Sequence, residues 1–403
     1  MTPKETSQGK KLELLQKKDW LEYPIFICGA PRSGTTLLVQ LLDGHPELLV
    51  LPLETHLLQY EHEQRTNFAN FLCDGYSKTH DIRMFTDLEY RSQFGDYMTR
   101  NYGPGPDNSF NLDVVAGEVF GSRYLTYLTD HGATLKTAYQ AHGDALFAAT
   151  NHEDGSLKAF VEKRPLDNEL STEELKSAFP HAKFIHILRD PRTRYISAKK
   201  RRISRRKKTG FAQACLGLNG LDFARALSEI ATVSFLLAAE NQARFKEDYL
   251  VIRYEDLLAD RSQIMREVGS FLGITYGESL CVQTAMGRPA YPHSSFALQT
   301  SNRVNVPSER LEAYYSATTR LERKIIDLYC SHSAAKFRYS LPIPKQIRLV
   351  DLFGRLANEV PFAIPTNRLK MLTELVGKPP EEVSHGAYLR LKTRWTNGFP
   401  CGD

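Results

Sequence analysis

The hydrophobic positions near the amino end of the chain predict a strand, a helix and a second strand. Residues 24–29 (PIFICG) form a short apolar run that ends at a glycine, as expected for a buried strand. Leucines then recur at helical spacing in TTLLVQLLDGHP, where Gly44 and Pro46 are stop signals. The next apolar run, ELLVLP, predicts another strand. A strand, a helix and a strand in this order build parallel sheets, so we expect an α/β fold.

The pattern becomes irregular between residues 59 and 153, where polar and aromatic residues are mixed. We interpret this stretch as an inserted helical cap over a substrate site, because elements that contact substrates usually lie in loops on a rigid scaffold. Regular segments follow, and two of them predict strands, at 183–188 (KFIHIL) and 249–254 (YLVIRY). Asp190 and Pro191 predict the start of a helix. Two further helices are predicted, one over 222–245 and one that ends near Leu272 before Gly273.

These elements predict a three-layer fold with a central parallel sheet and helices on both faces. We divide the chain into an amino-terminal lead (1–22), a main domain (23–340) that includes the cap, and a carboxyl-terminal extension (341–403). The extension contains the amphipathic segment IRLVDLFGRLANEV. This segment is expected to be a packing helix, an oligomer contact that would form a homodimer, or a helix on a membrane surface.

Composition narrows the class of protein only slightly. The 403 residues are 42% hydrophobic and 25% charged with a net charge of +5, which suits an anionic ligand without requiring nucleic acid. Six scattered cysteines form no CxxC pair, and we interpret them as reduced thiols. The amino terminus is polar and no apolar run reaches the roughly 18 residues of a spanning helix, so we expect a cytoplasmic protein without a transmembrane segment.

The segment FICGAPRSGTTLLVQLL, residues 26–42, has the glycines of a phosphate-binding loop but not its lysine, because Thr35 stands at that position. Backbone N–H groups and the helix dipole still favour an anion at such a turn. No apolar run ends in a carboxylate suited to hold Mg²⁺, so no metal is implied. The candidate anion-binding residues of this loop are Arg32, Ser33, Gly34, Thr35 and Thr36.

A second candidate anion site is present in FIHILRDPRTRYISAKKRR. Arg189 follows a predicted strand, at the sheet edge where ligands of open α/β sheets bind. Ser197 and Arg201 are one turn apart and share a helix face. The alternative is a capped helix start without a ligand.

The two motifs in this order resemble those of the sulfotransferases that use 3′-phosphoadenosine 5′-phosphosulfate (PAPS), with a pattern close to the bacterial and tyrosylprotein enzymes. The resemblance covers about residues 24–336. It implies that the first motif binds the 5′-phosphosulfate and the second the 3′-phosphate, with adenosine 3′,5′-bisphosphate (PAP) as product. A donor with a single sulfuryl group to transfer has no phosphate chain that requires the missing lysine.

The resemblance also implies roles for residues outside the two motifs. Glu54, in LPLETHLLQ, would be the base that deprotonates the acceptor, and His56 is its competitor. Lys163, in VEKRPLDNEL, would contact the sulfuryl group or the bridging oxygen, and with Arg32 it completes the catalytic set. Tyr254, Ser295 and Arg303 would contact the nucleotide.

We therefore expect an enzyme that moves a sulfuryl group to a hydroxyl, or less favourably an amine, of a small-molecule, carbohydrate or lipid acceptor by in-line displacement. The alternatives are a small-molecule kinase with a deviant phosphate loop and a non-catalytic protein that binds nucleotides or polyanions. The basic run KKRRISRRKK, residues 199–208, fits attraction of an anionic donor. Nuclear targeting, nucleic-acid binding and docking of an acidic acceptor stay open for it.

Overall fold

The computed structural model of the chain describes residues 19–93, 112–150, 156–207, 219–290, 307–342, 375 and 377–397, and for 201–207, 219–220 and 307–310 it describes the backbone alone. Contacts divide the chain into two compact units, each described by itself below. Unit 1 consists of Met1–Ile187, Asn241–His293 and Asn397–Asp403. Unit 2 consists of Leu188–Glu240 and Ser294–Thr396.

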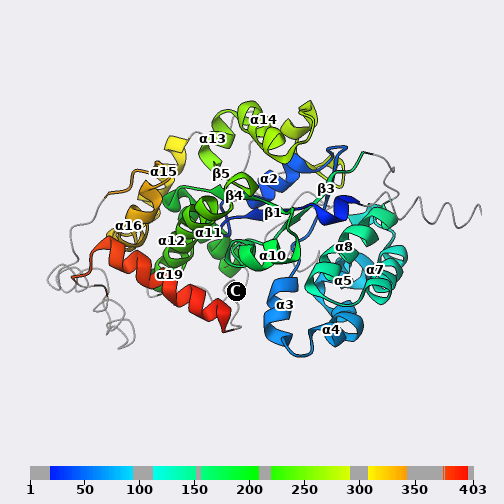
Figure 1. The fold of residues 1–403 in the computed structure, drawn as a ribbon. Helices are drawn as coiled ribbons and strands as arrows, with labels where there is room; N and C mark the ends of the chain where they lie inside the picture. The colour runs from blue at the N-terminus through cyan, green and yellow to red at the C-terminus, as the bar shows by residue number, and fades with distance from the viewer. Residues whose placement is uncertain are drawn as a thin grey trace, which may run out of the picture. The chain divides into compact units, whose positions relative to one another are not determined.

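The core of unit 1 is one five-stranded sheet with the order β2-β3-β1-β4-β5 (Figure 1). Its strands are β1 (Pro24–Cys28), β2 (Leu48–Val50), β3 (Ala159–Lys163), β4 (Lys183–Leu188) and β5 (Tyr249–Arg253). β1 pairs in parallel with β3 and β4, and β3 pairs in parallel with β2. The predicted parallel sheet is confirmed, and β3, which the hydrophobic pattern did not predict, lies between the first two predicted strands.

Side chains of alternate residues along each strand cover the two faces of the sheet. Ile25 and Ile27 of β1 belong to a buried aliphatic core that also includes residues of α2 (Thr35–Leu42), α13 (Tyr254–Ala259) and α14 (Arg261–Leu272). Phe26 points to the opposite face, where it meets the rings of Tyr139 and Phe184. Helices therefore cover both faces of the sheet, as predicted.

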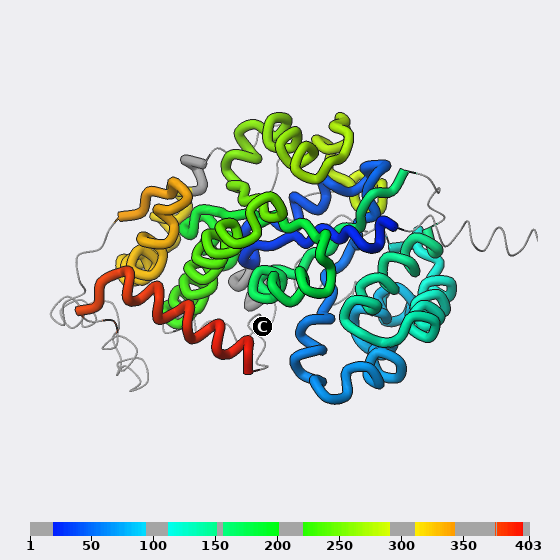
Figure 2. The backbone as a smooth tube through the Cα atoms, in the orientation of Figure 1, coloured from blue at the N-terminus to red at the C-terminus, as the bar shows by residue number. Residues whose placement is uncertain are grey.

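The stretch between β2 and β3, in which the cap was expected, consists in its described part mainly of helices joined by turns and short loops. Its helices gather in one group, in which α7 packs along α8, α5 on α7 and α3 on α8 (Figure 2). The elements are α3 (Leu57–Gln64), α4 (Phe68–Asn70), η2 (Phe71–Gly75), η3 (Tyr76–Lys78), α5 (His80–Thr86), η4 (Leu112–Val114), α7 (Gly117–His131) and α8 (Leu135–Ala149).

Shorter elements complete unit 1. They are η1 (Asp19–Glu22), α9 (Asp167–Leu170), α10 (Thr172–Ala178), η5 (Lys246–Asp248), η6 (Glu278–Cys281) and the antiparallel pair β6 (Thr284–Ala285) and β7 (Arg288–Pro289). As predicted, α14 ends before Gly273, which adopts a left-handed conformation with φ 71°.

Unit 2 is helical in its described part. Its helices are α11 (Pro191–Lys207), α12 (Asn219–Phe245, which continues into unit 1), α15 (Pro307–Ser316), α16 (Arg320–Ala335) and α19 (Pro380–Thr396). The hydroxyls of Thr232 on α12 and Ser384 on α19 both donate to the carbonyl oxygen of Tyr329, each at 2.7 Å, and so join three helices. The amphipathic segment IRLVDLFGRLANEV lies outside the described residues.

Candidate active site

The loop between β1 and α2 has the backbone shape of an anion cradle. Gly29 and Gly34 have φ angles of 139° and 113°, and Arg32 has a φ of 75°, which is uncommon for a residue with a side chain. Gly34 is the N-cap of α2 and provides no side-chain cap. The first-turn N–H groups of Thr35 and Thr36 have no partner inside a helix, so they are available to an outside acceptor.

Close packing explains why both glycines are required. A Cβ atom at Gly34 would overlap the ring of Tyr254, and one at Gly29 would lie 2.6 Å from the carbonyl oxygen of Ile187. Tyr254, the first residue of α13, therefore lies directly against the loop. The methyl group of Thr35 points back toward Gly29 and the side chain is buried, as is Ser33.

Lys163, the last residue of β3, joins the loop to the segment after β2. Its ammonium donates to the hydroxyl of Thr36 at 3.0 Å and lies 2.8 Å from a carboxylate oxygen of Glu54. Arg164 lies 3.6 Å from the other oxygen of Glu54. The parallel strands β2, β3 and β1 end at the same sheet edge, which is why these three segments meet there.

The two cations decide the charge of Glu54. Burial alone raises the pKa of this carboxyl, but Lys163, and after it Arg164, hold the pKa below its ordinary value. Glu54 is therefore ionised at neutral pH and able to accept a proton.

His56 is held by α5, one of the helices between β2 and β3. Its Nδ1 lies 2.5 Å from Asp81 and its backbone N–H donates to the same carboxylate at 2.7 Å. The hydroxyl of Tyr76 also donates to Asp81, at 2.7 Å, and lies 3.2 Å from Nε2 of the buried His142. A narrow cavity lined by Leu51, Leu53, Glu54, Thr55, Asp81, Phe85 and His142 adjoins this cluster. The structure thus places both candidate bases near the helices between β2 and β3.

The second motif lies in unit 2. α11 begins at Pro191 as predicted, and a carboxylate oxygen of Asp190 accepts from the N–H of Arg192 at 2.8 Å. Arg189 is buried, and its Nε donates to the hydroxyl of Thr193 at 3.1 Å. Ser197 is buried on the same helix. The side chain of Arg201 and all of Ser295 and Arg303 lie outside the described residues.

The basic run begins within this helix. Lys199 lies 2.7 Å from Glu322 and donates to the carbonyl oxygen of Ala317 at 2.9 Å, so the first cation of the run is tied to α16 and the turn before it. The side chains of 201–208 lie outside the described residues.

Comparison with known proteins decides the family. A sequence profile described as the Sulfotransferase family matches residues 24–278, which is more than half of the chain. The chain belongs to the sulfotransferase family.

One curated relative of this chain is protein-tyrosine sulfotransferase A of Caenorhabditis elegans, which is 24% identical over 256 residues. The match covers 64% of this chain and 51% of the relative, so the chain spans about half the length of that relative. Similar solved structures include the sulfotransferase domain of the Synechococcus PCC 7002 olefin synthase (19% identity, TM-score 0.44, covering 79% of this chain and 96% of that one). Sulfotransferase STF9 of Mycobacterium avium is another (17% identity, TM-score 0.37, 65% and 66% covered).

Sequence reasoning missed the buried polar residues beneath the candidate site. Glu162, next to Lys163, accepts from both the hydroxyl and the N–H of Thr55. Glu169 accepts from the N–H of Gly29 at 2.6 Å, so this first amide of the loop points into the protein. The only signal was the placement of acids in otherwise apolar or helix-starting segments, AFVEK and LDNEL.

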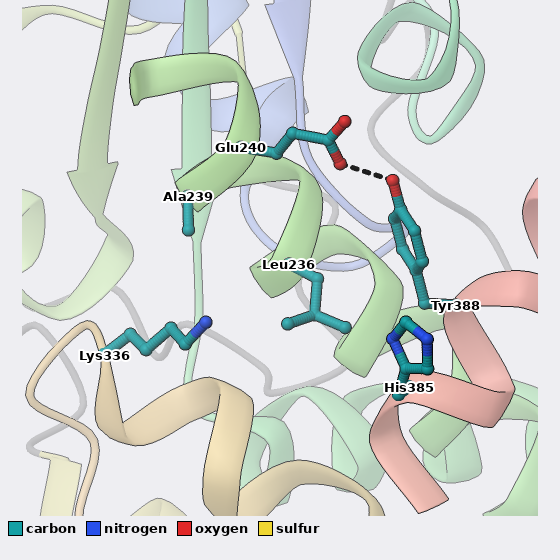
Figure 3. A pocket seen from close by; sticks show the side chains of 6 residues that line it. All are labelled: Leu236, Ala239, Glu240, Lys336, His385 and Tyr388. Carbon is teal, nitrogen blue, oxygen red and sulfur yellow. Dashed lines mark hydrogen bonds between the residues drawn. The ribbon is translucent and has the colours of Figure 1, made fainter. Parts of the chain in front are cut away.

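The structure has a larger cavity, of ≈ 340 Å³, in unit 2 (Figure 3). It is lined by Leu236, Ala239, Glu240, Lys336, His385 and Tyr388, and Tyr388 donates to Glu240. None of the residues predicted for the site lines it, so its size alone does not make it a substrate site.

Two further properties concern the described residues alone. They contain no group of three or more His, Cys, Asp or Glu side chains arranged to hold a metal ion. None of their helices combines the length and the apolar character needed to cross a membrane.

Proposed function

We propose that this chain transfers a sulfuryl group from PAPS to a hydroxyl, or less favourably an amine, of a small-molecule, carbohydrate or lipid acceptor. The observation that carries the proposal is Lys163, whose ammonium contacts both Thr36 of the phosphate loop and the carboxylate of Glu54. The ammonium of Lys163 therefore contacts both the proposed donor-binding loop and the proposed proton acceptor. Family membership favours this activity over the kinase alternative.

The residues fit a nucleotide of this kind. The left-handed loop leaves first-turn N–H groups of α2 for an anion, and the Tyr254 ring lies against Gly34 where a base or sugar would be bounded by an aromatic surface. Arg32, Ser33, Gly34, Thr35 and Thr36 would hold the 5′ end. Arg189, Ser197 and Arg201 would hold the 3′-phosphate, and Ser295 and Arg303 would contact the nucleotide. When bound, PAPS supplies an activated sulfuryl group on a phosphate leaving group.

The roles of the chain's own residues follow from their charges. Glu54 accepts the proton of the acceptor hydroxyl, because it is ionised and lies at the carboxyl edge of the sheet. Lys163 and Arg32 carry positive charge that would stabilise the negative charge developing on the leaving oxygen. His56, held by Asp81, orients the segment from Glu54 to α3 and remains the competitor for the role of base.

The experiment uses ³⁵S-labelled PAPS with a panel of phenols, sterols and saccharides, followed by identification of the labelled product. Binding is measured in parallel from the shift in melting temperature with PAP against ATP and Mg²⁺, since a ligand of the folded state raises its stability. We expect a shift with PAP and a labelled product. Stabilisation by PAP with no transfer to any acceptor and no loss of the label would instead support a non-catalytic binding protein.

A further inference from the structure

The last two residues of β3 hold two consecutive residues of the segment after β2. Lys163 lies 2.8 Å from the carboxylate of Glu54. Glu162, whose side chain is on the opposite face of the sheet, accepts from the Thr55 hydroxyl at 2.8 Å and from the Thr55 N–H at 3.4 Å. The segment that carries Glu54 is thus held by side chains from both faces of β3.

The second carboxylate oxygen of Glu162 extends this contact to the phosphate loop. It accepts from the Asn168 amide at 2.9 Å, and the same amide lies 3.2 Å from the carbonyl oxygen of Ile27 in β1. Ile27 precedes Gly29 by two residues. A single buried carboxylate therefore connects the segment that carries Glu54 with the strand that leads into the loop.

Burying the carboxyl group of Glu162 costs free energy of folding. This cost argues against a role in packing alone. Its side chain is fully buried, and none of the described ion pairs includes it. Asn168 is also fully buried, and its Oδ1 has no hydrogen-bond partner in the described part of the chain. An apolar side chain at position 162 would remove the cost of burying a carboxyl group but would leave the Thr55 donors unpaired.

We propose that Glu162 is a positioning residue that acts through Thr55 to hold Glu54 in register with Lys163 and the phosphate loop. The inference rests on the proposed function, in which Glu54 is the base. A displacement of about 1 Å at a reacting group can cost about a hundredfold in rate, so even a small shift of this segment would be measurable.

The test compares Thr55→Val, which removes the hydroxyl with little change of shape, with Thr55→Ser, which keeps it. Glu162→Gln is the partner variant. The control is Glu47→Gln, which removes a carboxylate at the opposite end of β2 and β3, where Glu47 lies 3.0 Å from Lys158 and accepts from the Thr275 N–H at 2.7 Å. Each variant is measured for melting temperature, for the Kd of PAP, and for kcat and KM with ³⁵S-labelled PAPS, using p-nitrophenol or water as acceptor.

We expect Thr55→Val to lower kcat by about tenfold or more while the Kd of PAP and the KM of the donor change less than about twofold. Thr55→Ser should regain most of kcat, and Glu47→Gln should keep it. The inference is overturned if Thr55→Val keeps the wild-type kcat, or if Thr55→Ser loses as much as Thr55→Val. A wild-type chain that binds PAP yet releases neither sulfated product nor sulfate would instead show that the proposed activity is wrong, and the positioning role would fail with it.

Discussion

The ammonium of Lys163 and the carboxylate of Glu54 lie 2.8 Å apart, although their residues are separated by more than a hundred positions, which include the helices between β2 and β3. The pair is possible because β3 inserts next to β2, so that both strands end at one edge. Lys163 also donates to Thr36. Because one ammonium contacts both partners, replacing Lys163 tests both contacts.

Lys163→Met should abolish most of the activity. We expect kcat to fall by about 10²–10³-fold, because the variant loses one preorganised group that stabilises the negative charge developing on the leaving oxygen. Lys158→Met is the matched control, since Lys158 precedes the same strand at its other end and pairs with Glu47. A loss of kcat that is the same in both variants would contradict a special role for Lys163.

The pH dependence of the rate distinguishes the two candidate bases. Because Lys163 and Arg164 hold the pKa of Glu54 below its ordinary value of 4.5, Glu54 stays ionised as the pH falls from 8 to 6. We expect kcat/KM to be flat over this range and kcat to drop by about 10²–10⁴-fold in Glu54→Gln. A rate that declines steadily between pH 8 and 6, and a loss confined to His56→Gln, would assign the base to the imidazole instead.

Gly34→Ala should impair both stability and nucleotide binding. The residue has a φ of 113° and an added Cβ would overlap the ring of Tyr254, whereas Gly132, with a φ of 81°, has nothing within 4 Å of such a Cβ. We expect a loss in the free energy of unfolding of about 3 kcal/mol for Gly34→Ala and about 1 kcal/mol for Gly132→Ala, measured by urea unfolding. Adding Tyr254→Ala to Gly34→Ala should recover part of the difference, because the overlap is then removed. Equal losses in the two glycine variants would refute the packing explanation.

Arg189→Ala should weaken recognition of a 3′-phosphate specifically. We expect the Kd of PAP to rise by about tenfold or more while the Kd of adenosine 5′-phosphate changes little, because a hydrogen bond to a charged group contributes about 1.5–3 kcal/mol. Thr193→Val, which removes the hydroxyl that Arg189 contacts, should have a smaller effect in the same direction. Titration calorimetry with the two nucleotides measures both, and a parallel loss for both nucleotides would argue against a 3′-phosphate site.

Glu162 should make the folded state less stable as the pH rises. Burial raises its pKa from 4.5 to about 7, so between these values the folded state holds a proton that the unfolded state has released. The free energy of unfolding is therefore expected to fall by about 3 kcal/mol relative to Glu162→Gln as the pH increases from about 4.5 to 7. Parallel stability curves for the two proteins, from urea unfolding at each pH, would show that Glu162 does not titrate in this range.

Local signals in the sequence predicted much of the fold. The apolar runs gave β1, β2, β4 and β5, and glycine and proline signals gave the ends of α2 and α14 and the start of α11. β3 was not predicted as a strand, because AFVEK is short and ends in two charged residues. Its place between β2 and β1 depends on pairing between strands that are separated in sequence by all the helices from α3 to α8, which no local pattern encodes.

The candidate site was predictable in its residue types more than in its contacts. The loop, Glu54, Lys163 and Tyr254 were all named from motifs, and the structure brings them together in unit 1. The contacts of Thr55 with Glu162 were not predictable, because they depend on which face of an unpredicted strand each side chain takes. The second motif lies in unit 2, and its shared role with the first stays a prediction.

The left-handed backbone of Arg32 bears on how natural variants of the loop are interpreted. Glycine or asparagine would adopt a φ of 75° with less strain than arginine does, so a chain carrying either residue at this position would keep the cradle and lose the guanidinium. Such a chain would still be expected to capture an anion without speeding its transfer. The backbone conformation of this loop and the positive charge of its side chain can therefore change independently among related chains.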